Sequence, residues 1–164
     1  MKILFLDCDG VLNNSETKDY VKTSDGKKYI EFSSISFRGL DSFRINYIRN
    51  IVKQTNCKIV LSTSWRFQDV FKNYLIKKLG KKTSFAIIDS TPARISPNRF
   101  IEIKDWLDQH NEVKTFVILD DFQSEGLEQF GKNFICTIHN KNGIQENGMN
   151  KDDMNLAIEL LNKR

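Results

Sequence analysis

Five short apolar runs, separated by longer stretches with helical spacing, determine what this sequence can fold into. Each run is almost continuous in apolar residues, which is typical of the buried parallel strands of an α/β protein. The runs occupy residues 2–7, 58–62, 84–89, 115–121 and 134–138, and the helical stretches occupy residues 39–55, 67–79, 98–110 and 150–163. This alternation predicts an α/β fold with a doubly wound, mainly parallel sheet.

Residues 13–37 interrupt the alternation and are polar. Within them, the sequence DYVKTSDGKKYIEF has the pattern of a hairpin that turns at Asp25 and Gly26. We interpret the segment as a small flap inserted after the first strand. The chain has no internal repeat and no linker rich in proline, glycine or serine, so we expect a single domain over residues 1–164.

The amino-acid composition indicates the cellular environment in which we expect the protein. The cysteines Cys8, Cys57 and Cys136 are odd in number and lack C-x-x-C spacing, which argues against a disulfide framework or a zinc site. No apolar run approaches the roughly 18 residues of a membrane span, and the first run is too short for a signal peptide. We therefore expect a cytoplasmic protein with no membrane partner. The net charge of +4 permits a polyanionic partner without requiring one.

Acidic and hydroxyl side chains stand at the ends of three predicted strands. Asp7 and Asp9 follow the first strand, Ser62 ends the second, and Asp120 and Asp121 end the fourth. Ligands of such sheets bind beyond the carboxyl ends of the strands, so neighbouring strands would bring these side chains to one crevice. Carboxylates this close repel one another unless a cation lies between them. Hard oxygen ligands without nearby His or Cys favour Mg²⁺.

These strand ends resemble motifs of the haloacid dehalogenase (HAD) superfamily. LDCDGVLN is similar to motif I, IVLS to motif II and VILDD to motif IV, in the expected order. Motif III, a basic residue that starts a helix, is matched by Arg99 or by Lys104, with Arg94 as a third candidate. LSTSWR and NRFIEIKDWL also resemble the small HAD domains associated with RNA-repair proteins. The phosphatase half of polynucleotide kinase-phosphatase is similar at the superfamily level.

The resemblance implies a Mg²⁺-dependent phosphomonoesterase with the Rossmann-like HAD fold. Asp7 is then the nucleophile that forms an aspartyl phosphate. Asp9 is the general acid that protonates the leaving oxygen and the base that later activates water. The implied Mg²⁺ ligands are Asp7, Asp120 and the backbone carbonyl of Asp9. Asp121 either completes the metal shell through water or orients it, with helix capping as the alternative.

Further residues are implied to bind the substrate phosphate. Ser62 would donate a hydrogen bond to a phosphoryl oxygen, with Thr63 and Ser64 as alternatives because the end of a predicted strand is uncertain by one residue. The cation of motif III neutralises the transferred group. Arg66 has two interpretations, one in which it reaches the substrate phosphate and one in which it pairs with a surface acid. Gly10, which follows Asp9, is the last residue implied to bind the substrate.

Other conspicuous side chains have structural interpretations. Trp65 and Trp106 are expected to pack in the interior rather than to stack on bases. Strand alternation directs Cys8 away from the site and into the core. His110 and His139 have no visible partner, and we assign them no role.

The short insertion resembles the capless subclass of HAD enzymes, whose open site accepts a phosphate on a large molecule. We therefore expect the substrate to be an RNA or DNA end or a nucleotide. One alternative is a small-molecule phosphatase that acts on a sugar phosphate or a nucleoside monophosphate. A second is a non-catalytic binding module, against which the intact set of acidic residues argues. The flap mixes lysines with acids, which weakens the case for nucleic acid.

Overall fold

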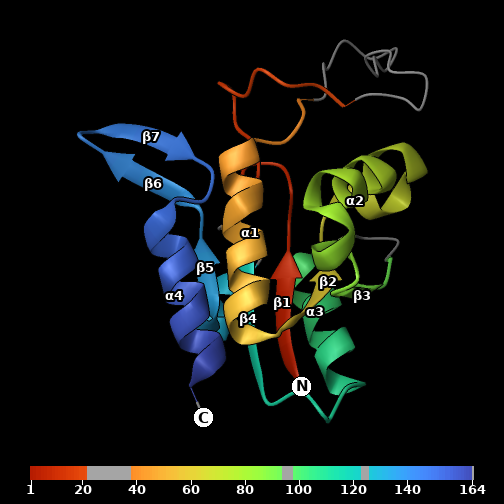
Figure 1. The fold of residues 1–164 in the computed structure, drawn as a ribbon. Helices are drawn as coiled ribbons and strands as arrows, with labels where there is room; N and C mark the ends of the chain where they lie inside the picture. Colours follow the sequence, from red (N-terminus) through yellow and green to blue (C-terminus); the bar gives the residue numbers. More distant parts are fainter. Residues whose placement is uncertain (22–37, 94–97, 123–125, 164) are drawn as a thin grey trace.

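A five-stranded parallel sheet forms the centre of the molecule (Figure 1). The computed structural model describes residues 1–21, 38–93, 98–122 and 126–163. The strands lie in the order β3-β2-β1-β4-β5, and each pairs in parallel with its neighbours. Their bounds are β1 Lys2–Leu6, β2 Lys58–Leu61, β3 Ile87–Ser90, β4 Thr115–Asp120 and β5 Phe134–Cys136. The predicted α/β fold with a doubly wound parallel sheet is confirmed.

Strand β1 is covered on both faces, which explains why it is apolar throughout. Leu4 and Leu6 belong to one buried cluster, and Ile3 and Phe5 belong to the other. Cys8 continues the first set and is fully buried, as strand alternation predicted. A strand enclosed in this way delivers the residues that follow it to a protected edge of the sheet.

Helices cover the two faces of the sheet (Figure 1). Helices α1, α2 and α4 contribute to the cluster on one face, while α3 and the 3₁₀ segment η2 contribute to the cluster on the other. The bounds are α1 Ser42–Thr55, η1 Ser64–Phe67 (a short 3₁₀ helix), α2 Asp69–Ser84, α3 Arg99–Asp108, η2 Leu127–Asn133 and α4 Lys151–Asn162. The four expected helices are all present, with ends shifted by a few residues.

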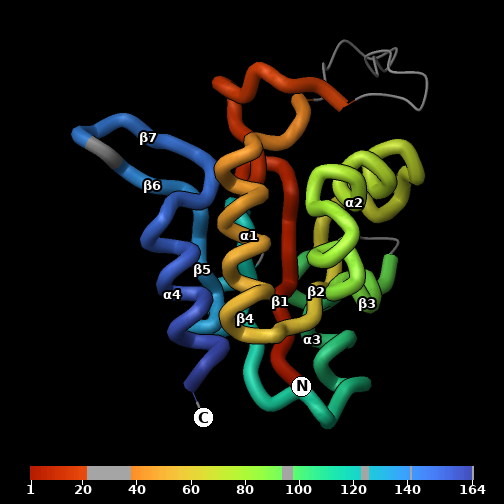
Figure 2. The backbone as a smooth tube through the Cα atoms, viewed as in Figure 1, coloured from red at the N-terminus to blue at the C-terminus, as the bar shows by residue number. Residues whose placement is uncertain are grey.

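Two of the predicted strands have different bounds in the structure. The strand expected at 84–89 begins only at Ile87, because α2 continues to Ser84 through a break at Gly80, where φ is 75°. The strand expected at 134–138 is present as β5 but is shorter than expected. The chain then forms an antiparallel hairpin of β6 Ile138–Lys141 and β7 Ile144–Asn147, which we did not predict. Figure 2 shows this hairpin projecting above α4, at the end of the sheet where the strands terminate.

The insertion after β1 is described only in part. Tyr20 and Arg38 form an isolated antiparallel bridge, which brings the two ends of the polar segment together. The hairpin turn expected at Asp25 and Gly26 lies outside the described residues.

The helices and the cysteines relate to the environment expected from the sequence. The helices in the described ranges are all too short or too polar to cross a bilayer. Among the described residues Cys8, Cys57 and Cys136 form no disulfide, and the first two are buried.

Candidate active site

Parallel pairing brings the ends of β1, β2 and β4 side by side. The backbone N–H of Asp7 donates to the carbonyl of Leu119 at 3.1 Å. The backbone N–H of Ser62 donates to the carbonyl of Leu6 at 3.1 Å. Asp120 is the last residue of β4, so its side chain lies at the same edge. The predicted convergence of these residues at the carboxyl ends of the strands is therefore present.

Three carboxylates meet at this edge of the sheet. Asp7, Asp120 and Asp121 each place one oxygen within 4.8 Å of the others. Asp7 is 6% exposed and Asp120 is fully buried. Burial, and then the neighbouring Asp120 carboxylate, raise the pKa of Asp7 to about 8, although Arg99 lowers it. Burial also raises the pKa of Asp121. These hard, closely spaced oxygens suit a divalent cation such as Mg²⁺.

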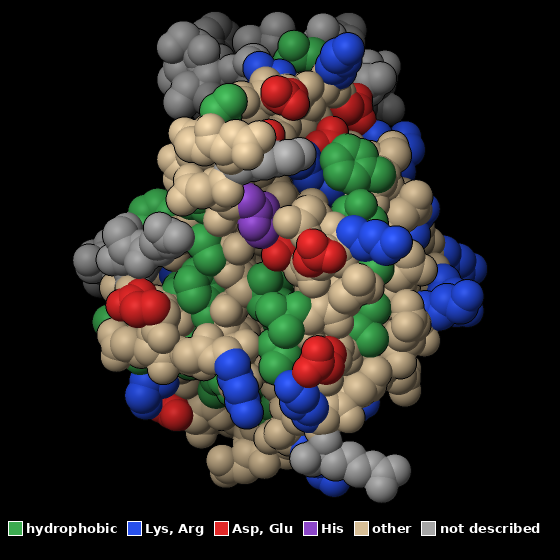
Figure 3. Space-filling view, turned by 90° about the vertical axis from the view of Figure 1, so that its left-hand side faces the viewer, with side chains coloured by type: hydrophobic (Ala, Val, Ile, Leu, Met, Phe, Trp, Pro, Cys, Tyr) green, Lys and Arg blue, Asp and Glu red, His purple; other side chains and the backbone are tan. Residues whose placement is uncertain are grey.

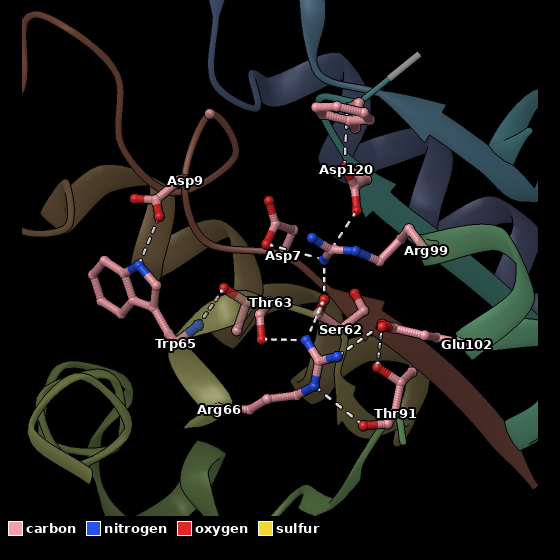
Figure 4. A network of polar contacts seen from close by, with 12 residues as sticks. Asp7, Asp9, Ser62, Thr63, Trp65, Arg66, Thr91, Arg99, Glu102 and Asp120 are labelled. Carbon is pink, nitrogen blue, oxygen red and sulfur yellow. Dashed lines mark hydrogen bonds and ion pairs between the residues drawn. The ribbon is translucent and has the colours of Figure 1, made fainter. Parts of the chain in front are cut away.

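Arg99 brings a positive charge into the cluster from the first residue of α3. Its Nη1 atom lies 3.3 Å from Oδ1 of Asp7 and 3.4 Å from Oδ2 of Asp120 (Figure 4). The same atom donates to the carbonyl of Ser62. The side chain of Asn98 caps the helix and so fixes the turn that carries the arginine. The geometry places Arg99 where the cation of motif III was expected.

Lys104, the alternative cation, lies outside the cluster. Its side chain is 54% exposed and pairs with Asp108 at 2.6 Å on the surface of α3. The reason is helical geometry, because a residue one and a half turns after the first residue of α3 faces another direction. Arg94 lies outside the described residues.

The hydroxyl of Ser62 is buried at the same edge. Within the part of the chain that the structure describes, its Oγ atom has no hydrogen-bond partner. An unsatisfied buried polar group costs about 1–3 kcal/mol, so this position is suited to a ligand oxygen. Thr63 Oγ1 instead accepts from the backbone N–H of Trp65 at 3.3 Å, and Ser64 is exposed. Of the three candidate hydroxyls, only that of Ser62 combines burial with the lack of a partner.

Two donors hold the carboxylate of Asp9. Trp65 Nε1 donates to its Oδ2 at 2.7 Å (Figure 4). Asn13 Nδ2 donates to its Oδ1 at 2.9 Å. Trp65 is buried and packs against Phe71, with ring centroids 5.1 Å apart, so its expected packing role is confirmed. Its bond to Asp9 was not predicted. Asn13, four residues after Asp9, is the feature of the sequence that indicated a hydrogen bond to this carboxylate.

Gly10 allows the chain to pass close to Asp121. Its φ is +70°, and a Cβ atom built there would lie 1.8 Å from Oδ2 of Asp121. The carbonyl of Gly10 accepts from Thr137 Oγ1 at 2.8 Å. Asn147, the last residue of β7, donates to Oδ2 of Asp121 at 3.5 Å. The residues around the unpredicted hairpin therefore support this side of the site.

Arg66 supports the backbone beneath the site and pairs with an acid, as one of its two interpretations expected, although that acid is not on the surface. Its Nη1 atom donates to the carbonyls of Ser62 at 3.1 Å and Thr63 at 2.6 Å. Its Nε atom donates to the carbonyl of Thr91 at 3.1 Å. Its Nη2 atom pairs at 2.7 Å with Glu102, an acid that is buried rather than on the surface. The guanidinium is directed at these protein atoms (Figure 4).

A cavity of about 1360 Å³ opens beside the site. Asp9, Gly10 and Asp121 border it at one end. It continues between the start of α1, where Phe43 and Tyr47 line it, and the β6–β7 hairpin. A group attached to a phosphate at the carboxylates would extend into this space.

A family model described as the HAD domain in Swiss Army Knife RNA repair proteins matches residues 3–148. The matched range runs from β1 to the end of β7 and contains every residue of the site described above. No curated protein matches the chain.

Proposed function

Because the chain belongs to the family of HAD domains in Swiss Army Knife RNA repair proteins, we propose that it is a phosphomonoesterase acting on a nucleic-acid end or a nucleotide. The family match confirms the resemblance seen in the sequence. The observation that carries the proposal is the convergence of the Asp7 carboxylate, the Arg99 guanidinium and the unpartnered hydroxyl of Ser62.

The proposed reaction has two steps. In the first, an oxygen of Asp7 attacks the phosphorus in line, and the bond to the leaving oxygen breaks as Asp9 gives that oxygen a proton. The product is an alcohol and an aspartyl phosphate on Asp7. In the second step Asp9 takes a proton from water, whose oxygen attacks the phosphorus. The bond to Asp7 breaks, which releases inorganic phosphate and restores both carboxyl groups.

Two further side chains stabilise the transferred group. Ser62 Oγ donates to a non-bridging oxygen, which supplies the hydrogen bond that this hydroxyl lacks among the described residues. Arg99 offsets the negative charge that the phosphoryl group brings to the carboxylates. Removing one such donor from an active site lowers the rate by about 10²–10³-fold.

The residues present fit a divalent cation. Asp7, Asp120 and Asp121 offer three hard oxygens at one point, and among the described residues Arg99 is the cation that pairs with two of them. When bound there, such a cation would neutralise part of the charge on the carboxylates and on the phosphoryl group. We therefore include Mg²⁺ in the proposal.

The neighbouring cavity supports a substrate larger than a sugar phosphate. Its volume of about 1360 Å³ exceeds the range of about 300–1,000 Å³ that is usual for small-molecule pockets. Phe43, which is 51% exposed, lines it together with Asn147. Such a lining can hold a base by stacking and hydrogen bonding.

The decisive experiment is phosphate release with Mg²⁺ from a matched panel. The panel contains 3′- and 5′-phosphorylated RNA and DNA oligonucleotides, mononucleotides, sugar phosphates and a generic aryl phosphate. We expect strong preference for one oligonucleotide end, and no turnover by Asp7→Asn. Preference for sugars or mononucleotides would instead favour the small-molecule phosphatase. Lack of turnover of every substrate, the aryl phosphate included, would favour the non-catalytic binding module.

A further inference from the structure

The positive charge of the chain is concentrated in one segment. Residues 42–88 contain a single acid, Asp69, and ten basic residues. The basic residues are Arg44, Arg49, Lys53, Lys58, Arg66, Lys72, Lys77, Lys78, Lys81 and Lys82. The segment thus carries nine more positive than negative charges, against four for the whole chain, so the remainder of the chain is net acidic.

Part of this segment surrounds a second cavity, of about 560 Å³. The cavity lies between the C-terminal parts of α1 and α2 and the starts of β2 and β3. We call it the basic cleft, and its charged lining residues are Arg49, Lys53, Lys58, Lys81 and Lys82. None of the described residues that line it is acidic. Phe85 borders the basic cleft with 70% of its surface exposed.

The preference of helix ends for particular charges explains only part of this distribution of basic residues. Cations are favoured in the last turn of a helix, which explains Lys53 in α1 and Lys81 and Lys82 in α2. It does not explain why α1 has no acid at all. It also does not explain Lys58, which begins a strand.

Solvated helices elsewhere in the molecule mix their charges. Lys104 pairs with Asp108 on α3, and Lys163 pairs with Glu159 next to the end of α4. Figure 3 shows acidic and basic side chains interspersed on the face that includes α4, whereas basic side chains gather along its right-hand edge. Lys81 and Lys82 have no acid at comparable spacing within α2. The surface of α1 and α2 therefore differs from that of an ordinary soluble helix pair.

The basic cleft is separate from the candidate active site. Lys58 starts β2 and Ser62 follows its end, so four residues of extended strand separate them. At about 3.3 Å per residue this is about 13 Å. A ligand in the basic cleft lies at the amino end of the sheet, opposite the carboxylates.

We propose that the basic cleft binds the sugar–phosphate backbone of a single-stranded nucleic acid, with Phe85 as the platform for one base. Proteins that hold single strands combine a positively charged groove with exposed aromatic rings on which bases stack. The cleft offers both features, and its concave form suits a strand better than a flat anionic membrane. This inference goes beyond the proposed function, because it requires no catalysis and concerns another surface.

The test is binding of a single-stranded RNA of about 12 nucleotides without terminal phosphates, a length within the usual site size. Fluorescence anisotropy of the labelled RNA is followed between about 50 and 200 mM salt. The variant Lys53→Gln/Lys81→Gln/Lys82→Gln is compared with Lys104→Gln/Lys114→Gln/Lys163→Gln, which removes the same charge elsewhere on the exposed surface.

We expect the cleft variant to bind at least about tenfold more weakly, and its logarithmic salt slope to fall by about 2, or about 0.7 for each lost phosphate contact. The control variant should keep the wild-type slope. Phe85→Ala should weaken binding at least fivefold without changing the slope, because stacking of a base contributes about 1–3 kcal/mol.

Three outcomes would overturn the inference. They are no binding of this RNA by the wild type, equal weakening by both lysine variants, and binding of the wild type to phosphatidylserine vesicles but not to RNA. Circular dichroism of each variant, with Lys82→Gln alone as a milder change, shows whether the fold is kept. The RNA has no phosphomonoester, so a failure of the proposed catalysis would leave this assay unaffected.

Discussion

The indole nitrogen of Trp65 donates a hydrogen bond to the carboxylate of Asp9 at 2.7 Å, across 56 residues of sequence. Trp65 comes from η1, directly after β2, and its ring is buried against Phe71 and Tyr74. The orientation of the proposed general acid therefore depends on how a core tryptophan packs. Asn13 completes the arrangement from the loop after β1.

Trp65→Phe should keep most of the packing and remove the donor. A hydrogen bond to a charged group contributes about 1.5–3 kcal/mol, so we expect turnover of substrates with poor leaving groups to fall about tenfold or more. Activated aryl phosphates need little protonation and should be affected much less. The measurement is kcat/KM for aryl phosphates whose leaving groups differ in pKa. Trp106→Phe is the matched control, because its indole donates at 2.7 Å to Asp89, outside the site.

The buried pair of Arg66 and Glu102 should contribute to stability far more than its exposed counterpart. Removing one partner of a buried ion pair costs about 3–5 kcal/mol, so Glu102→Ala should lower the free energy of unfolding by an amount in this range. Asp108→Ala breaks the exposed pair with Lys104 and should cost less than about 1 kcal/mol. Urea unfolding of both variants tests the difference. Similar losses would mean that Arg66 is not held by its carboxylate partner.

The central sheet was predictable because its signal is local and strong. Each buried parallel strand is a continuous apolar run, and β1 needs such a run because two clusters cover it. The carboxyl ends of parallel strands lie at one edge of a sheet, so Asp7, Ser62 and Asp120 were expected to meet if their strands were neighbours, as they are. Lys104 could not be separated from Arg99 in this way, because the choice depends on which side of α3 faces the sheet.

The β6–β7 hairpin was missed because its strands are polar. Strand β7 is largely exposed, so it has no alternation of apolar and polar residues to detect. The turn residues Asn142 and Gly143 both have positive φ, at 52° and 79°, as a type I′ turn requires. That Asn-Gly pair was the available signal. The bond between Trp65 and Asp9 carried no comparable signal, since it arises from tertiary packing alone.

Gly10→Ala should impair metal binding rather than only strain the backbone. A Cβ atom at Gly10 would collide with Oδ2 of Asp121 and displace a proposed ligand. Gly143→Ala is the matched control, because φ is +79° there and no atom lies within 4 Å of the added Cβ. Strain of a side chain at positive φ should cost both variants about 1–2 kcal/mol of stability, and the collision with Asp121 adds to this cost only in Gly10→Ala. Only Gly10→Ala should reduce the rise in Tm that Mg²⁺ produces; an equal rise in both variants would contradict Asp121 as a ligand.

Asp7 should make the metal-free protein less stable as the pH rises. Burial and the Asp120 carboxylate raise its pKa from 3.8 to about 8 in the folded state. Between these two values the folded protein binds a proton that the unfolded chain has released. The contribution of Asp7 therefore lowers the free energy of unfolding with increasing pH, by at most about 1.4 kcal/mol per pH unit.

Asp7→Asn removes this titration. We expect the variant to gain stability relative to the wild type between about pH 5 and 7, measured by urea unfolding with a chelator present. Asp108→Asn changes the net charge equally at an exposed position and should show no such trend. Addition of Mg²⁺ should raise the Tm of the wild type at the upper end of this range and leave Asp7→Asn nearly unchanged, because the ionised carboxylate is then paired. If the free energy of unfolding changed equally with pH in the wild type and in Asp7→Asn, Asp7 would already be ionised without a metal. Its charge would then be compensated by Arg99.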